Sequence, residues 1–122
     1  KWREKNRFNN NLRFFKNLPI NTYVNLMKKT SVLVGNSSSG IREGAFIGTP
    51  VVNIGTRQES RQRGKNVIDV DYDSNEILKA IKKQIKHGKY LCQDIYGDGK
   101  AGKKISKILT KCDLEIQKKI TY

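Results

Sequence analysis

Short apolar runs alternate with amphipathic segments along most of the chain. The runs at 31–35 (SVLVG), 50–55 (PVVNIG) and 66–71 (NVIDVD) are rich in β-branched residues. This is typical of strands in a parallel sheet, and the first two predict strands that are buried on both faces. A shorter run at 12–15 (LRFF) also predicts a strand. Helical segments separate most of the strands, which predicts an α/β fold with helices on both faces of a parallel sheet.

The first two predicted helices lie on either side of the run at 31–35. Asn21 is a good N-cap for a helix that ends near Lys29, with apolar positions three and four residues apart. Residues 41–48 (IREGAFIG) form a second, short helix, which Gly48 and Pro50 stop.

Two further helices are predicted in the C-terminal half. Asp73 is the N-cap of one, with Glu76 at the capping-box position, and Gly88 ends it. Its predicted core-facing residues are Ile77, Leu78, Ile81 and Ile85. The last helix runs from about residue 100 to Cys112, which we expect to be a core thiol. Its apolar positions are Ala101, Ile105, Ile108, Leu109 and Cys112.

Composition predicts a thin hydrophobic core. The chain has 122 residues, 36% of them hydrophobic, with a mean hydropathy of −0.67. A chain of this length is enough for one small domain or for half of a larger fold. The segments 56–65 and 89–98 are predicted as loops.

A net charge of +14 makes nucleic-acid binding an alternative to consider. Most of the lysines fall on the polar faces of predicted helices, where solvation explains them. A nucleic-acid surface would interleave arginines with aromatic residues, and the C-terminal helices lack that pattern. We therefore keep a basic nucleic-acid-binding module only as an alternative, which predicts a steep salt dependence.

Cysteine and histidine usage argues against a metal site. Cys92 and Cys112 have no second pair of ligands beside them, and His87 is the only histidine. We expect His87 on the surface and no metal or cofactor. Two cysteines form no disulfide framework, so a reducing, cytoplasmic location is expected. No apolar run approaches the length of about 20 residues that a membrane span needs. The chain begins without a methionine or a signal peptide, so the natural N-terminus is expected to lie elsewhere.

The turn at 36–40 (NSSSG) carries the main chemical signal. It follows a predicted strand and opens a helix, at the sheet edge where α/β proteins bind ligands. Free backbone N–H groups, the helix dipole and serine hydroxyls favour a phosphate there, and Gly40 is expected to relieve the limits on φ. The alternative is a plain N-cap in a tight turn.

Glu43 and Arg57 extend this hypothesis. Glu43 lies about one turn into the helix, where a carboxylate suits the hydroxyls of a ribose. Arg57 follows the next strand, where a guanidinium suits a diphosphate. The alternative for Glu43 is that the helix dipole favours an acidic residue there, and the alternative for Arg57 is that it belongs to an ordinary solvated loop. The sequence shows no nucleophile with a base and no pair of carboxylates for acid/base catalysis.

Two stretches resemble a known family. The run VGNSSSGIREGAFIGTPVVNIGTRQ (34–58) is similar to the C-terminal half of hydrolysing UDP-N-acetylglucosamine 2-epimerases, especially of the sialic-acid-pathway type. YLCQDIYGDGKAGKKISKIL (90–109) resembles the end of the same domain. The resemblance implies that residues 1–122 are most of a Rossmann-like, UDP-binding C-terminal domain, the second domain of a GT-B-type fold. The N-terminal catalytic domain of the same protein would be absent, and the intact protein is expected to be a homo-oligomer.

The resemblance also implies a substrate, a reaction and a site. UDP-N-acetylglucosamine would lose its C2 proton and UDP to give a 2-acetamidoglucal, and water would then add to release N-acetylmannosamine. No catalytic residue is expected in this chain. The residues implied for UDP binding are Ser37, Ser38, Ser39, Gly40, Glu43 and Arg57.

Two related activities remain open on the sequence alone. A hydrolysing 2-epimerase of UDP-diacetylbacillosamine is expected to have the same pattern in its second domain. The donor-binding domain of a GT-B glycosyltransferase uses the same sheet edge, also with a glutamate for the ribose.

Overall fold

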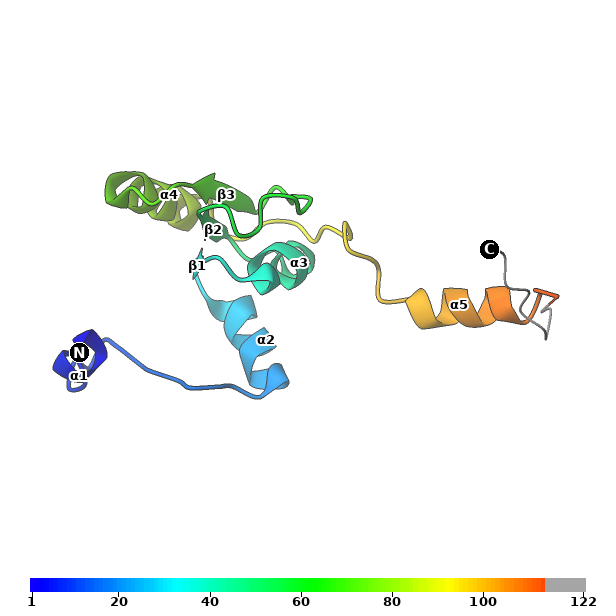
Figure 1. The fold of residues 1–122 in the computed structure, drawn as a ribbon, viewed down its shortest axis with the longest axis horizontal. Helices are drawn as coiled ribbons and strands as arrows, with labels where there is room; N and C mark the ends of the chain where they lie inside the picture. Colours follow the sequence, from blue (N-terminus) through cyan, green and yellow to red (C-terminus); the bar gives the residue numbers. More distant parts are fainter. Residues whose placement is uncertain (114–122) are drawn as a thin grey trace, which may run out of the picture.

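Three parallel strands form the centre of the molecule (Figure 1). The structure is a computed structural model that describes residues 1–113. The strands are β1 (Leu33–Gly35), β2 (Val51–Ile54) and β3 (Val67–Val70), in the order β1-β2-β3. The parallel α/β sheet predicted from the sequence is therefore confirmed.

Five helices accompany the sheet in the described part of the chain: α1 (Trp2–Lys5), α2 (Ile20–Lys29), α3 (Ser38–Ile47), α4 (Ser74–His87) and α5 (Ala101–Leu109). The helices α3 and α4 lie on opposite sides of the strands in Figure 1, and both contact β2 and β3. Gly48 ends α3 in the left-handed conformation, with φ of 75°, and Gly88 ends α4, as predicted.

The core is thin, as the composition predicts, and it centres on β2. Val51 and Val52 are both buried, although neighbouring side chains of a strand point to opposite faces of the sheet. Both faces of β2 are therefore covered. The buried hydrophobic residues are Met27, Ile41, Ala45, Val51, Val52 and Ala80.

The buried face of α4 differs from the predicted one. Asp73 caps the helix as expected, accepting from the N–H groups of Asn75 and Glu76 at 2.9 Å each. Leu78 and Ile85 are about half exposed, however, and the buried residues of α4 are Ala80 and Gln84. Gln84 is buried because its amide group donates to the backbone carbonyls of Val51 and Asn66, at 2.7 and 2.9 Å.

Three predictions near the N-terminus are wrong. Residues 12–15 form no strand. The strand β1 is not buried on both faces, since Val34 is 41% exposed. Pro19, not Asn21, occupies the N-cap of α2, and its fixed φ suits the entry to a helix. Strand β1 pairs only with β2 in the described sheet, which leaves its other edge open.

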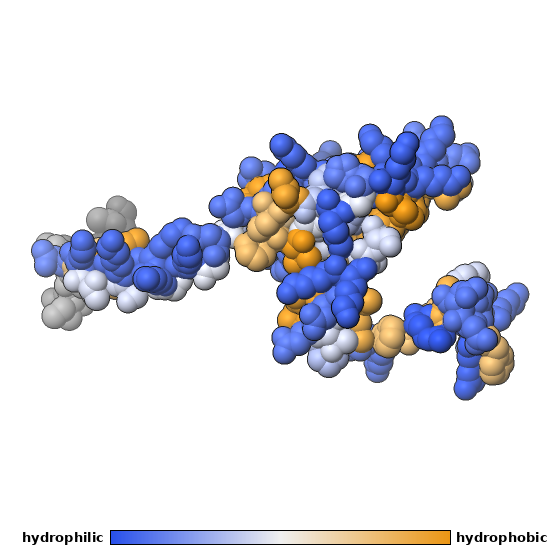
Figure 2. Space-filling view, turned by 180° about the vertical axis from the view of Figure 1, so that it is seen from behind, coloured by the Kyte–Doolittle hydropathy of each residue, from blue (hydrophilic) through white to orange (hydrophobic). Residues whose placement is uncertain are grey.

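The helices α1 and α5 lie apart from the central body (Figure 1). None of their residues is buried. Cys112 lies beyond the end of α5 and is exposed, as is Cys92, so the prediction of a core thiol is wrong. Seen from behind, hydrophilic residues cover most of the visible face of α5, and hydrophobic patches show mainly on the central body (Figure 2).

Candidate functional site

The serine turn lies at the carboxyl edge of the sheet. Asn36 and Ser37 join β1 to α3, and the other three residues of the turn already belong to α3, which begins at Ser38 and not at residue 41 as predicted. Ser37 is the N-cap of α3, and its hydroxyl accepts from the N–H of Ser39 at 3.4 Å. Ser37 is exposed and Ser38 is half-buried. The first turn of α3 contains no acidic residue, so its positive end is not neutralised locally. The turn is both an N-cap and an exposed helix N-terminus that suits an anion.

Ser39 is held by two other hydroxyl groups. Its oxygen lies 2.9 Å from that of Ser37 and 2.7 Å from that of Tyr23, which belongs to α2. Ser37, Ser39 and Tyr23 line one cavity of about 480 Å³, together with Leu18 and Ile20 and other residues that precede or begin α2. No sequence signal indicated the contact between Tyr23 and Ser39.

Gly40 has a different role from the predicted one. Among the described residues it is not one of the glycines with positive φ. It is buried, and a Cβ there would lie 3.0 Å from Cγ1 of Val51 and 3.1 Å from Cδ2 of Leu33. A glycine suits this position because α3 approaches the sheet closely there, and a side chain would force Val51 and Leu33 to shift.

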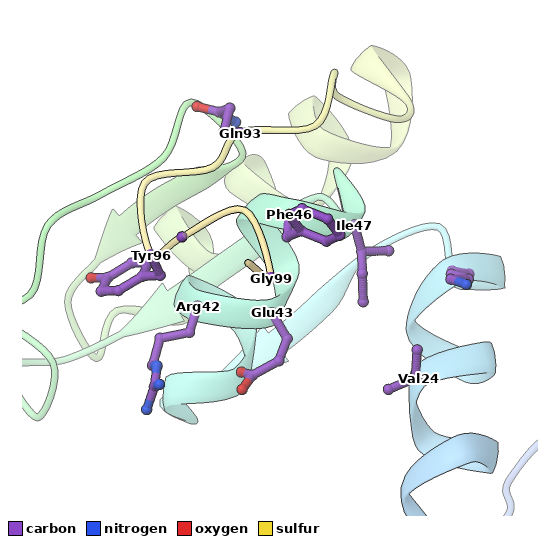
Figure 3. Close-up of a pocket in the computed structure, with 10 residues that line it drawn as sticks. Val24, Arg42, Glu43, Phe46, Ile47, Gln93, Tyr96 and Gly99 are labelled. Carbon is purple, nitrogen blue, oxygen red and sulfur yellow. The ribbon is translucent and has the colours of Figure 1, made fainter. Parts of the chain in front are cut away.

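Glu43 lines a second cavity, separate from the one lined by the serines. This cavity has a volume of about 430 Å³ and lies between α2, α3 and the segment before α5 (Figure 3). Its walls include the apolar side chains of Val24, Phe46 and Ile47. Tyr96 faces Arg42 there, with the guanidinium carbon 5.9 Å from the ring centre. The structure therefore does not bring Glu43 and the serines into one cavity.

Arg57 lies beside the serine turn, at the sheet edge where we expected it. Its Nη1 donates to Oδ1 of Asn36 at 3.4 Å, and the side chain is otherwise exposed. Gln58 is 5% exposed and donates to the backbone carbonyl of Asn36 at 2.9 Å. The loop after β2 thus touches the turn after β1. No sequence signal distinguished Gln58 from the other polar residues of its loop.

A third cavity, of about 510 Å³, opens at the ends of β2 and β3. Arg63 forms an ion pair with Asp69 there, with an N–O distance of 2.9 Å. Burial alone would raise the pKa of Asp69, but hydrogen bonds from Arg63 and Asn53 outweigh it and hold that pKa below its ordinary value. The other acidic residues that line the cavity are Glu59, Asp71 and Glu76.

Residues 1–113 contain no group of three or more His, Cys, Asp or Glu side chains arranged to hold a metal ion. None of the helices in this range is long and apolar enough to cross a membrane. His87 is exposed, as predicted, and its ring stacks on that of Tyr90 with 3.9 Å between the ring centres.

A comparison with protein families adds to this geometry. The family model described as UDP-N-acetylglucosamine 2-epimerase matches residues 2–110. The match includes the serine turn, Glu43 and Arg57.

Several curated proteins are similar to the chain. A UDP-N,N'-diacetylbacillosamine 2-epimerase (hydrolyzing) of Legionella pneumophila is 36% identical over 106 residues, which are 87% of this chain and 28% of that protein. A UDP-N-acetylglucosamine 2-epimerase of Neisseria meningitidis is 36% identical over 70% of this chain and 22% of its own length. A GDP/UDP-N,N'-diacetylbacillosamine 2-epimerase (hydrolyzing) of Campylobacter jejuni is 44% identical over 58% of this chain and 18% of its own. The chain thus spans less than a third of the length of these relatives.

Proposed function

The chain belongs to the UDP-N-acetylglucosamine 2-epimerase family, and from this premise we propose that it is the UDP-binding part of a hydrolysing 2-epimerase. Residues 1–122 would form most of the C-terminal domain of that enzyme. The N-terminal domain would supply the acid/base residues, and the intact enzyme would be a cytoplasmic homo-oligomer. Its products would be UDP and N-acetylmannosamine, for the biosynthesis of sialic-acid-type sugars.

The observation that carries this proposal is the position of Arg57 beside the serine turn. A guanidinium 3.4 Å from Asn36 stands next to the free N-terminus of α3, so two sources of positive potential meet at one edge of the sheet. A diphosphate is the anion that suits both at once, since it offers one phosphate to the helix N-terminus and the other to arginine. The position of Arg57 beside this exposed helix N-terminus supports a phosphate site in addition to the N-cap that Ser37 forms.

We assign the proposed roles as follows. Ser37 and Ser38 donate hydroxyl and backbone hydrogen bonds to the diphosphate, while Ser39 and Gly40 continue and shape the turn. Arg57 neutralises charge on the diphosphate. Glu43 accepts hydrogen bonds from the ribose hydroxyls, which requires the nucleoside to extend from the serine turn along α3 into the separate cavity that Glu43 lines.

In the proposed reaction this half of the enzyme holds the leaving group. A base removes the proton at C2 of the sugar, the C1–O bond to UDP breaks, and a 2-acetamidoglucal forms. Water then adds across the double bond, and N-acetylmannosamine is released. Negative charge grows on the departing UDP, so Arg57 and the N-terminus of α3 lower the barrier for this step. No residue of the described chain receives an acid/base role.

UDP-N,N'-diacetylbacillosamine is a second candidate substrate. The relatives from Legionella pneumophila and Campylobacter jejuni are named for hydrolysing 2-epimerases that act on the bacillosamine sugar. The proposed UDP site serves either sugar, because the two substrates would share the nucleoside diphosphate. Other residues of the enzyme would contact the substituents of the sugar ring and discriminate between the two substrates.

Calorimetric titration of the chain with UDP tests the site. We expect binding by the wild type, and about tenfold weaker binding by Arg57→Gln, which loses one charge-assisted hydrogen bond. Arg7→Gln is the matched control, since it removes the same charge from an exposed residue of the N-terminal segment. If wild type and Arg57→Gln bind alike, Arg57 is not part of the site. If the wild type gives no heat where the intact enzyme does, the UDP site itself is refuted. Release of UDP by the intact enzyme from each sugar then identifies the substrate.

A further inference from the structure

Arg63 makes the largest set of side-chain hydrogen bonds in the loop at 56–65. Its Nη1 donates to the backbone carbonyl of Gln58 at 2.6 Å and also to that of Arg61. Both carbonyls belong to the loop that carries Arg57. A single guanidinium therefore links two backbone carbonyls of the same loop.

The same guanidinium ties the loop to the sheet. Its Nε donates to both carboxylate oxygens of Asp69 on β3, at 3.1 and 2.9 Å. Asp69 is held in turn by the side-chain amide of Asn53 on β2, at 2.6 Å. Asn53 is 1% exposed, so this anchor reaches into the buried centre of the sheet. The Arg63 side chain is 24% exposed and that of Asp69 is 49% exposed, so solvent screens the ion pair in part.

The loop continues from this anchor to the serine turn. Gln58, whose carbonyl Arg63 holds, donates its side-chain amide to the carbonyl of Asn36 at 2.9 Å. Arg61 donates its Nε to Oε1 of Gln58 at 2.6 Å, which orients the amide so that its nitrogen faces Asn36. Arg57 precedes Gln58 directly and reaches Oδ1 of the same asparagine. The position of Arg57 is thus set by a chain of bonds that begins at Asp69.

We propose that Arg63 is a positioning residue for the nucleoside diphosphate: it fixes the loop that presents Arg57 to the serine turn, and it acts through Arg57. This inference rests on the proposed function, which supplies the ligand. A planar guanidinium suits the role because it binds a carboxylate and two carbonyls in fixed directions. A lysine has the charge but not this geometry.

Two measurements on the full chain test the proposal. The first is amide hydrogen exchange of residues 56–65 without ligand, in wild type, Arg63→Gln and Arg63→Lys. We expect faster exchange in both variants. The second is a double-mutant cycle for UDP binding with Arg57→Gln and Arg63→Gln. We expect Arg63→Gln alone, and Arg63→Lys, to weaken UDP binding about fivefold, and Arg63→Gln to have no further effect in the Arg57→Gln background. Arg7→Gln is the control for lost charge.

The outcomes separate this inference from the proposed function. Faster exchange together with a non-additive cycle supports it. Unchanged exchange overturns it, and so does an additive cycle, because Arg63 would then act on stability or on UDP independently of Arg57. Normal UDP binding by Arg63→Lys also overturns it, since charge alone would suffice. If the wild type does not bind UDP, the proposed function fails, and the exchange experiment alone decides whether Arg63 positions Arg57.

Discussion

The side-chain amide of Gln58 donates to the backbone carbonyl of Asn36 across 2.9 Å, although 22 positions separate the two residues in the sequence. This bond joins the loop after β2 to the turn after β1. Adjacent parallel strands end at the same edge of a sheet, so the sequence order β1-α3-β2 brings these two segments together. The proposed site depends on this hydrogen bond, because the loop after β2 carries Arg57 and the turn after β1 carries the serines.

Glu43 and Ser38 are expected to separate two parts of the ligand. Glu43→Gln should weaken the binding of UDP about tenfold and leave the binding of inorganic pyrophosphate unchanged, because Glu43 is assigned to the ribose. Ser38→Ala should weaken the binding of both ligands, because Ser38 is assigned to the phosphates. Calorimetric titration of both variants with both ligands checks this. Equal losses for UDP and pyrophosphate in Glu43→Gln would contradict the ribose assignment.

Gln84 should contribute strongly to stability. Gln84→Met preserves much of the side-chain volume but removes the donors to the carbonyls of Val51 and Asn66 and the acceptor for Tyr90. Leaving buried polar groups unpaired costs about 1–3 kcal/mol of unfolding free energy. Urea denaturation measures the loss, and Gln62→Met, at an exposed position, is the control. A loss no greater than that of the control would show that water replaces these bonds.

Gly48 is expected to tolerate no side chain. Its φ is 75°, and a Cβ would overlap the backbone carbonyl of Tyr90, whose own N–H donates to the carbonyl of Gly48 at 2.9 Å. Gly99→Ala is the matched control, because Gly99 has the same φ but open space around it. Gly99→Ala should lose about 1–2 kcal/mol of unfolding free energy, because alanine disfavours a positive φ. We expect a clearly lower melting temperature for Gly48→Ala, which adds the overlap with Tyr90 to this loss. Similar melting temperatures would mean that the segment at Tyr90 moves away freely.

Asp69 makes the stability of the chain depend on acid pH. Its pKa is lowered in the folded state, so its contribution is fully present above its ordinary pKa of 3.8 and is lost as the pH falls through the lower folded value. Arg63→Gln removes one cause of the lowering and should flatten this dependence. Denaturation of both proteins at pH 7 and at pH 3 checks the difference. Parallel losses of stability in the two proteins would show that the ion pair does not couple to folding.

Much of the central fold follows from the sequence. The predicted strands at 50–55 and 66–71 and the helices that became α3 and α4 are present, because β-branched runs, glycine stops and the Asp73 cap act over a few neighbouring residues. The serine turn was identified in the same way, since its position between a strand and a helix is a local property. The close approach of Gly40 to the sheet could not be identified from the sequence, because it depends on contacts with Val51 and Leu33 in the neighbouring strands.

What only the tertiary structure decided concerns burial and side-chain partners. Leu78, Ile85 and Cys112 have apolar spacing but are exposed, since spacing does not show which side of a helix meets the sheet. Gln58 and Arg63 looked like ordinary residues of a polar loop. Gln58 bonds to Asn36 in the turn after β1, and Arg63 bonds to Asp69 on β3. These hydrogen bonds form only when the strands assemble into the sheet. Local pattern therefore determined the elements and the candidate turn, and the packing of the strands determined which residues hold that turn in place.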